Sequence, residues 1–161
     1  MQEQKKITYT PLQALQKIKI YCAYQERCHS EVETKLYLYG LTTTEVGECI
    51  CTLIEENYLN EERYAIAYAG GKCRINHWGK QKISYTLKQK KVSDYCIKKA
   101  LLQITDDDYE KAYAKNELVA LASAKGEKNS YTKKRKISDY LRSRGYETYL
   151  IQETLKNMRV K

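Results

Sequence analysis

The side chains that most often carry out chemistry are few in this chain. It has two histidines, His29 and His77, and six cysteines. Cys28 beside His29, and Cys73 four residues before His77, could each supply two metal ligands, but the paired Cys-x₂-Cys pattern of a structural zinc site is missing. Ser30, next to His29, is better explained as a helix cap than as half of a nucleophilic pair. We therefore predict no enzymatic activity, no bound metal and no cofactor.

Positive charge is the stronger chemical signal. The formal net charge is +9, yet residues 26–63 hold nine acidic and only three basic side chains, whereas residues 72–99 hold nine basic side chains and one acidic one. More bases follow between residues 133 and 144. Basic clusters of this kind suit a phosphate backbone or an acidic protein surface. For any single lysine, a solvated helix face remains the simpler explanation.

Tyrosine is unusually frequent, with 16 Tyr, one Trp and no Phe. Aromatic rings among basic residues could stack on unpaired bases; the rings placed in this way are Tyr85, Tyr131, Tyr140, Tyr146 and Trp78. We favour a structural role for most of them, because a chain without Phe must use Tyr for its aromatic core contacts.

One helical pattern occurs three times along the chain, and the helices that it predicts carry these side chains. A leucine is followed four residues later by Gly40, Lys91 or Gly145, and apolar residues recur at equal distances after each of them. The copies lie a little over 50 residues apart, so each unit has room for about three helices. Caps such as Ser30 with Glu33 mark the expected starts.

The period and the caps together predict an all-α fold of about nine helices in an elongated, curved array of three-helix units. We expect an acidic first unit at 1–57, a basic second unit at 58–104 and a basic third unit at 105–161. The expected helices are 11–25, 31–39, 43–56, 61–75, 80–90, 94–104, 106–124, 132–144 and 147–158.

Cellular location can also be predicted from the sequence. No apolar run approaches the roughly 20 residues that span a bilayer, and no signal-peptide core follows the first residues. We therefore expect a soluble, cytoplasmic protein whose cysteines are free thiols.

The central third of the chain resembles the signature of the RecX regulatory proteins. The matching residues run from Tyr58 through Asn60, Glu61, Glu62, Arg63, Tyr64 and Ala65 to Tyr68, Lys72, Trp78, Gly79, Lys82, Ile83, Leu87, Val92, Ile97 and Leu101. Three positions depart from the family pattern: Asn60 replaces an acid, Lys72 an Arg, and Lys91 a Gly. The last departure puts one helix end in doubt.

The resemblance implies tandem three-helix units that bind the RecA recombinase and lie along the groove of its filament on DNA. It also implies that the protein limits the ATPase, strand-exchange and co-protease activities of RecA in recombination, DNA repair and the SOS response. The expected partners are RecA and the RecA–DNA filament, with weak non-specific DNA binding, no membrane and a monomeric state. The candidate contacts are Lys72, Arg74, Lys80, Lys82, Lys88, Lys90 and Lys91 in the second unit, and Lys133, Lys134, Arg135, Lys136, Arg142 and Arg144 in the third.

Two other interpretations stay open. Three-helix units with a basic last element also suit a direct DNA-binding protein of helix-turn-helix type, acting as a repressor or architectural protein. A helical scaffold for an acidic protein is the third possibility, and it would bind no DNA.

Overall fold

The computed structural model describes residues 8–160, and within this range it contains nine α-helices and one short 3₁₀ helix. The elements are α1 (Pro11–Tyr24), α2 (His29–Leu38), α3 (Thr43–Glu55), α4 (Glu61–Arg74), α5 (Lys80–Gln89), α6 (Asp94–Leu102), α7 (Asp106–Ser123), α8 (Ser130–Ser143), α9 (Thr148–Asn157) and η1 (Met158–Val160). The prediction of an all-α fold is confirmed, and the expected helix bounds agree to within about two residues.

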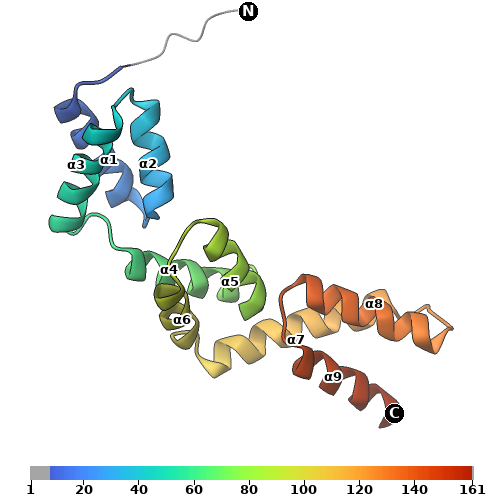
Figure 1. Ribbon diagram of the computed structural model, residues 1–161. Coiled ribbons are helices and arrows are strands. Elements are labelled where there is room, and N and C mark those ends of the chain that lie inside the picture. The colour runs from blue at the N-terminus through green and yellow to red at the C-terminus, as the bar shows by residue number, and fades with distance from the viewer. Residues whose placement is uncertain (1–7, 161) are drawn as a thin grey trace, which may run out of the picture.

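The helices form a row of groups rather than a single bundle (Figure 1). Buried side chains of α1–α3 make one core with Leu59, while those of α4–α9 make a second, larger core. Val46, Ile97 and Ile151, which occupy the same place in the three sequence copies, are all buried. The exact unit bounds 1–57, 58–104 and 105–161 remain a prediction.

Most helix starts follow the expected caps. Thr42, Asn60 and Thr105 each accept a hydrogen bond from a backbone N–H in the first turn of the helix that follows. The expected cap at Ser30 is wrong, because α2 begins two residues earlier with Cys28 as its N-cap. The Ser30 hydroxyl instead donates to the carbonyl oxygen of Lys90, at 2.9 Å.

The middle helix of every unit ends in the same turn. Gly40, Lys91 and Gly145 all have positive φ, of 88°, 62° and 91°, and each is followed by a residue whose N–H bonds back to the last core leucine of the helix. This is the left-handed C′ geometry that favours glycine. Lys91 adopts it despite its side chain, so the second unit keeps the turn that the sequence had put in doubt.

The second and third units meet where the end of α8 caps the start of α5. The N–H of Gly79 donates to the carbonyl of Arg144 at 2.7 Å, and the N–H of Gln81 donates to that of Gly145 at 3.0 Å. Gly79 offers no side-chain cap, so these carbonyls satisfy free N–H groups of α5. The negative end of the α8 dipole also faces the positive end of α5. A Cβ on Gly79 or Gly145 would collide with the opposing chain.

The same carbonyl position is used at each of the three middle helices. The residue before each positive-φ turn accepts one hydrogen bond from a residue earlier in the chain. Tyr39 accepts from the N–H of Tyr9, Lys90 from the hydroxyl of Ser30, and Arg144 from the N–H of Gly79. The second and third of these contacts join neighbouring units, whereas the first lies within the first unit.

Replacing Gly79 with Ala should lower the free energy of unfolding by about 1–3 kcal/mol, because the added methyl group has no space against Gly145. The matched control is Gly47→Ala in α3, where nothing lies within 4 Å of the new Cβ. Removal of a helix-interior glycine there should stabilise by about 0.5–1 kcal/mol. Urea unfolding measures both, and equal stability of the two variants would contradict the close approach of α5 and α8.

Leu87→Ala tests the repeat itself. Leu87 is fully buried, as its place in the repeat predicts, so truncation should cost about 2–5 kcal/mol of unfolding free energy. Chemical denaturation of the variant measures this cost. A near-neutral result would mean that this position does not lie in the core.

Candidate functional site

The centre of the candidate site is Trp78, which lies between two lysines. The Nζ of Lys72, near the end of α4, is 4.8 Å from a Trp78 ring centroid, and the Nζ of Lys82, in the first turn of α5, is 4.4 Å away. The connection between α4 and α5 places the ring there, with the N–H of Trp78 bonded to the carbonyl of Lys72 at 3.0 Å. These are cation–π contacts, which hold an ammonium group without neutralising it.

A third cation joins this pair from the next unit. Burial, and then the charges of Arg144 and Lys72, lower the pKa of Lys82 below its usual value. Among residues 8–160, no carboxylate lies within 4.0 Å of the cationic nitrogens of Lys72, Lys82 or Arg144. Like charges held together without a counter-ion favour the binding of an anion.

The third unit holds the Trp78 connection in place. The carbonyl of His77 accepts hydrogen bonds from the Tyr146 hydroxyl and from the amide of buried Asn116, both at 2.7 Å. Arg144 Nε donates to the side-chain Oδ1 of Asn116 at 3.1 Å, and Arg144 Nη2 donates to the backbone carbonyl of Asn76 at 2.6 Å. The cation cluster therefore exists only where the second and third units are docked.

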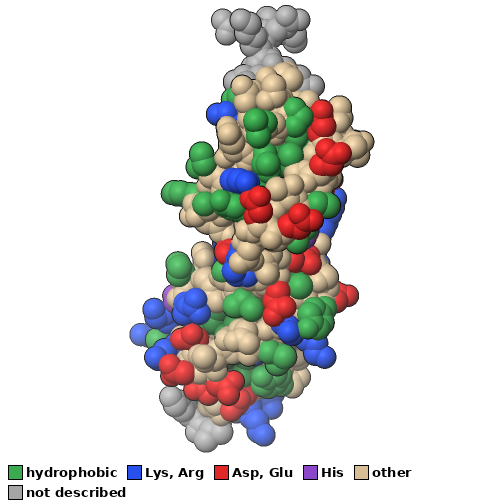
Figure 2. All heavy atoms as spheres, turned by 90° about the vertical axis from the view of Figure 1, so that its left-hand side faces the viewer, with side chains coloured by type: hydrophobic (Ala, Val, Ile, Leu, Met, Phe, Trp, Pro, Cys, Tyr) green, Lys and Arg blue, Asp and Glu red, His purple; other side chains and the backbone are tan. Residues whose placement is uncertain are grey.

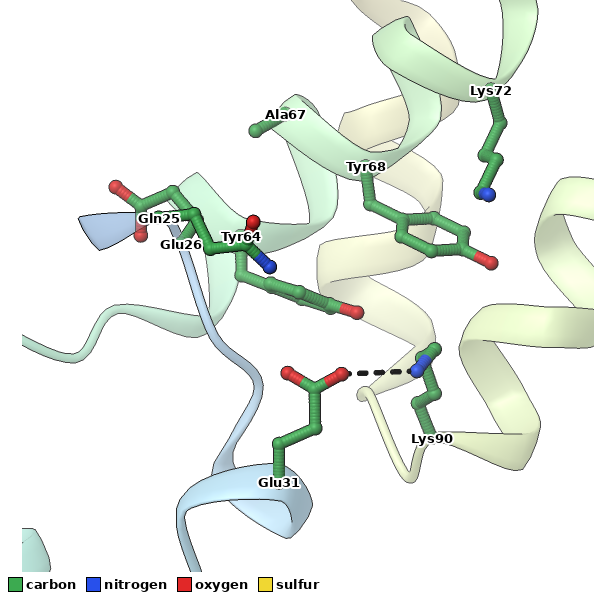
Figure 3. A pocket seen from close by; sticks show the side chains of 8 residues that line it. All are labelled: Gln25, Glu26, Glu31, Tyr64, Ala67, Tyr68, Lys72 and Lys90. Atoms are coloured by element: carbon green, nitrogen blue, oxygen red, sulfur yellow. Dashed lines mark hydrogen bonds and ion pairs between the residues drawn. The ribbon is translucent and has the colours of Figure 1, made fainter. Parts of the chain in front are cut away.

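Rings and cations continue toward the first unit. Tyr68 lies between Lys72 and Lys90, with centroid distances of 5.4 and 5.9 Å to their Nζ atoms. Figure 3 shows Lys72 and Lys90 on either side of Tyr68 at a hollow of about 360 Å³, with Lys90 reaching Glu31. We call the whole row the Trp78 strip; its members are Lys90, Tyr68, Lys72, Trp78, Lys82 and Arg144.

The two ends of the strip differ electrostatically. Lys90 Nζ forms an ion pair with Glu31 at 3.1 Å. Burial disfavours the charged form of Lys90, but the hydrogen bond and charge of Glu31 outweigh this effect and raise its pKa. The Lys90 end is thus internally neutralised, whereas the Trp78 end keeps its positive charge available.

The remaining candidates of the second unit lie outside the strip. Arg74 forms a long ion pair with Asp108, at 3.8 Å. Lys80 Nζ lies 4.7 Å from the Tyr109 ring centroid. Lys88 and Lys91 are exposed side chains near the far end of α5. These residues are close to Lys72 and Lys82 in the sequence, but the packing of α4 on α5 places their side chains away from the Trp78 strip.

The third-unit candidates divide into two groups. Arg144 belongs to the Trp78 strip, whereas the others lie along α8. Arg142 is paired with Asp139 at 3.7 Å, and Lys136 with Glu127 at 2.9 Å. The basic candidates in α8 that form no ion pair among residues 8–160 are Lys133, Lys134 and Arg135. These three form a separate basic turn near the start of α8.

Lys and Arg side chains are unevenly distributed over the surface. On the side of the molecule in Figure 2 they gather in the lower half, below the first three helices. Within residues 8–160, no three potential metal ligands come together, and no helix has the length and apolar character needed to cross a membrane.

Comparison with known proteins finds similarity to RecX proteins. The profile described as the second three-helix domain of RecX matches residues 60–101, which include α4, α5 and most of α6. A regulatory protein RecX of Lactobacillus johnsonii is 33% identical over 96 residues, which cover 60% of this chain and 35% of that protein. A regulatory protein RecX of Bacillus cereus is 27% identical over 142 residues, which cover 86% of this chain and 51% of that protein.

The chain is thus similar to RecX regulatory proteins, and the match to the family profile lies in its central helices. Two solved RecX structures share the fold. One superimposes with a TM-score of 0.81 at 20% identity, covering 91% of this chain and 71% of the other. The RecX of Lactobacillus salivarius superimposes with a TM-score of 0.78 at 23% identity, covering 94% and 97%. The chain spans about half the length, or less, of the two curated relatives.

Replacing Lys82 with Met should leave the free energy of unfolding within about 0.5 kcal/mol of the parent or raise it. The physical reason is that the methionine keeps the packing of the stem but removes a charge that burial, Arg144 and Lys72 all disfavour. Lys90→Met is the contrast, because it leaves the half-buried Glu31 carboxylate without its partner, and it should cost about 0.5–1 kcal/mol. Urea titration of both variants decides, and a larger loss for Lys82→Met would show that the cluster is internally neutralised.

Proposed function

We propose that this chain is a regulatory protein that binds the RecA recombinase and its filament on DNA. By this proposal it inhibits or modulates the ATPase, strand-exchange and co-protease activities of RecA in recombination, DNA repair and the SOS response. Similarity to RecX proteins supports a regulatory role, since the relatives named above are regulatory proteins. We propose further that the protein is a cytoplasmic monomer and that it acts by binding, without chemistry of its own.

The observation that carries the proposal is the uncompensated charge of the Trp78 strip. Lys72 and Lys82 face the Trp78 ring instead of carboxylates, and Arg144 adds its charge from the other side of the unit junction. Two of them lie within the residues that match the RecX domain. A filament of RecA on DNA offers both phosphates and protein surface to such a row, and phosphate binds Arg and Lys strongly through charge-assisted hydrogen bonds.

The shape of the array is consistent with this partner. The three groups of helices follow one another in a row (Figure 1), so a long partner could contact more than one unit at once. The basic turn formed by Lys133, Lys134 and Arg135 is a second candidate contact in the third unit. Binding through phosphates alone should give naked DNA only a weak, salt-sensitive affinity.

The test is the ATPase rate of the cognate RecA on single-stranded DNA, with this protein added from well below stoichiometric amounts. We expect inhibition, and we expect the variant Lys72→Gln with Lys82→Gln to need at least about tenfold more protein, because two unneutralised charges are lost. The control carries Lys98→Gln and Lys128→Gln, two exposed lysines outside the strip with the same change in net charge. Circular dichroism checks that all three proteins are folded.

Three results would change the conclusion. No inhibition by the folded parent at saturation contradicts the RecA proposal. Equal loss in the strip and control variants would show that only net charge matters, and not the strip. Tight, sequence-specific binding to duplex DNA would favour the direct DNA-binding interpretation, because phosphate contacts carry no sequence information.

A further inference from the structure

A second row of rings and cations lies on the first three helices. Lys17 Nζ is 4.8 Å from the Tyr9 ring centroid, and the guanidinium carbon of Arg27 is 3.8 Å from that of Tyr21. Lys35 Nζ lies between two rings, 5.4 Å from Tyr21 and 5.8 Å from Tyr39. Tyr9 and Tyr39 pack edge to face at 5.2 Å. We call this set the first-unit patch; its members are Tyr9, Lys17, Tyr21, Arg27, Lys35 and Tyr39.

The cations of the first-unit patch lack acidic partners although they belong to the acidic unit. Among residues 8–160, no carboxylate lies within 4.0 Å of the charged nitrogens of Lys17, Arg27 or Lys35. Lys19, two residues from Lys17 on the same helix, does pair with a carboxylate, that of Glu56 at 2.5 Å. Residues two apart on a helix do not share a face. The fold therefore leaves these three cations without an ion pair among the described residues, although the unit is acidic overall.

The first-unit patch adjoins the Trp78 strip. A hollow lined by Tyr21, Glu31 and Lys35 also has a volume of about 360 Å³. Glu31 is shared with the hollow that Lys72 and Lys90 line (Figure 3). Glu26 and Glu31, the acids that line these hollows, are paired with Arg63 and Lys90, so neither places an unpaired carboxylate between the two groups of cations.

We propose that the first-unit patch is a second contact for single-stranded nucleic acid, continuous with the Trp78 strip. Lys17, Arg27 and Lys35 bind backbone phosphates. The lysines leave the tyrosine faces when they do so, and the exposed rings then become available to unpaired bases, which stack on aromatic side chains. This inference rests on the proposed binding to DNA within the filament, and it adds the acidic unit to the contact surface.

The experiment measures the affinity of the full chain for a fluorescently end-labelled oligothymidylate over a range of salt concentrations. The variant Lys17→Gln with Lys35→Gln should reduce the slope of log affinity against log salt by about 1.4, since each lost cation on a single strand accounts for about 0.7. Near 0.1 M salt the affinity should fall by roughly an order of magnitude. Lys17→Arg with Lys35→Arg keeps both charges and should restore the parent slope.

The matched control is Lys19→Gln with Lys98→Gln, which removes the same net charge outside the patch and should leave the slope unchanged. A parent slope for Lys17→Gln with Lys35→Gln, together with a reduced slope for Lys72→Gln with Lys82→Gln, would overturn this inference and leave the proposed function standing. Parent slopes for both pairs would count against DNA contact at either place. Equal losses in all three variants, control included, would show a general effect of net charge and would also overturn it.

Discussion

The structure depends on one contact between helix ends. The carbonyl before each positive-φ turn accepts a hydrogen bond from a residue earlier in the chain, and at the junction of α8 with α5 this contact caps a helix that lacks a side-chain cap. The free N–H groups at the start of one helix thus donate hydrogen bonds to the free carbonyls at the end of another, so that neither set is left unsatisfied. Because Gly79 and Gly145 allow the two backbones to touch, the orientation of the third unit on the second is set by backbone geometry, with little freedom left to side chains.

The candidate site is a consequence of that junction. Arg144 reaches Lys82 only because the α8 turn lies against the start of α5, and Trp78 keeps its place because His77 is bonded to Tyr146 and Asn116 of the third unit. Functional sites on repeat proteins commonly lie on surfaces that stacking of the units creates. In this RecX-like chain the stacking also brings like charges together, and their mutual repulsion is a cost that an anionic partner would relieve.

Tyrosine has two different uses in this protein. Buried Tyr64, Tyr109 and Tyr146 serve the core, and burial raises the pKa of each hydroxyl. Tyr21, Tyr39 and Tyr68 instead lie beneath lysine or arginine side chains at the surface. A ring holds a cation at a modest gain of about 0.5–1 kcal/mol and leaves its charge unneutralised, whereas a carboxylate would cancel it. Tyrosine therefore supplies the aromatic core contacts of a chain without Phe, and its contacts with cations give it a second role at the surface.

The sequence by itself determined the helices, most of their caps, the buried positions of the repeat and the resemblance to RecX proteins, because these depend on local periodicity and on residues close together in the chain. It also indicated that Lys72, Lys82 and Arg144 belong to basic stretches. Only the tertiary structure decided that Lys72 and Lys82 meet at the Trp78 ring within the field of Arg144, that Lys90 is neutralised by Glu31, and that Ser30 links two units instead of capping a helix. The first-unit patch could not be predicted from the sequence for the same reason. A count of charged residues along 26–63 averages over all faces of the helices. Binding depends instead on which charges the fold places side by side.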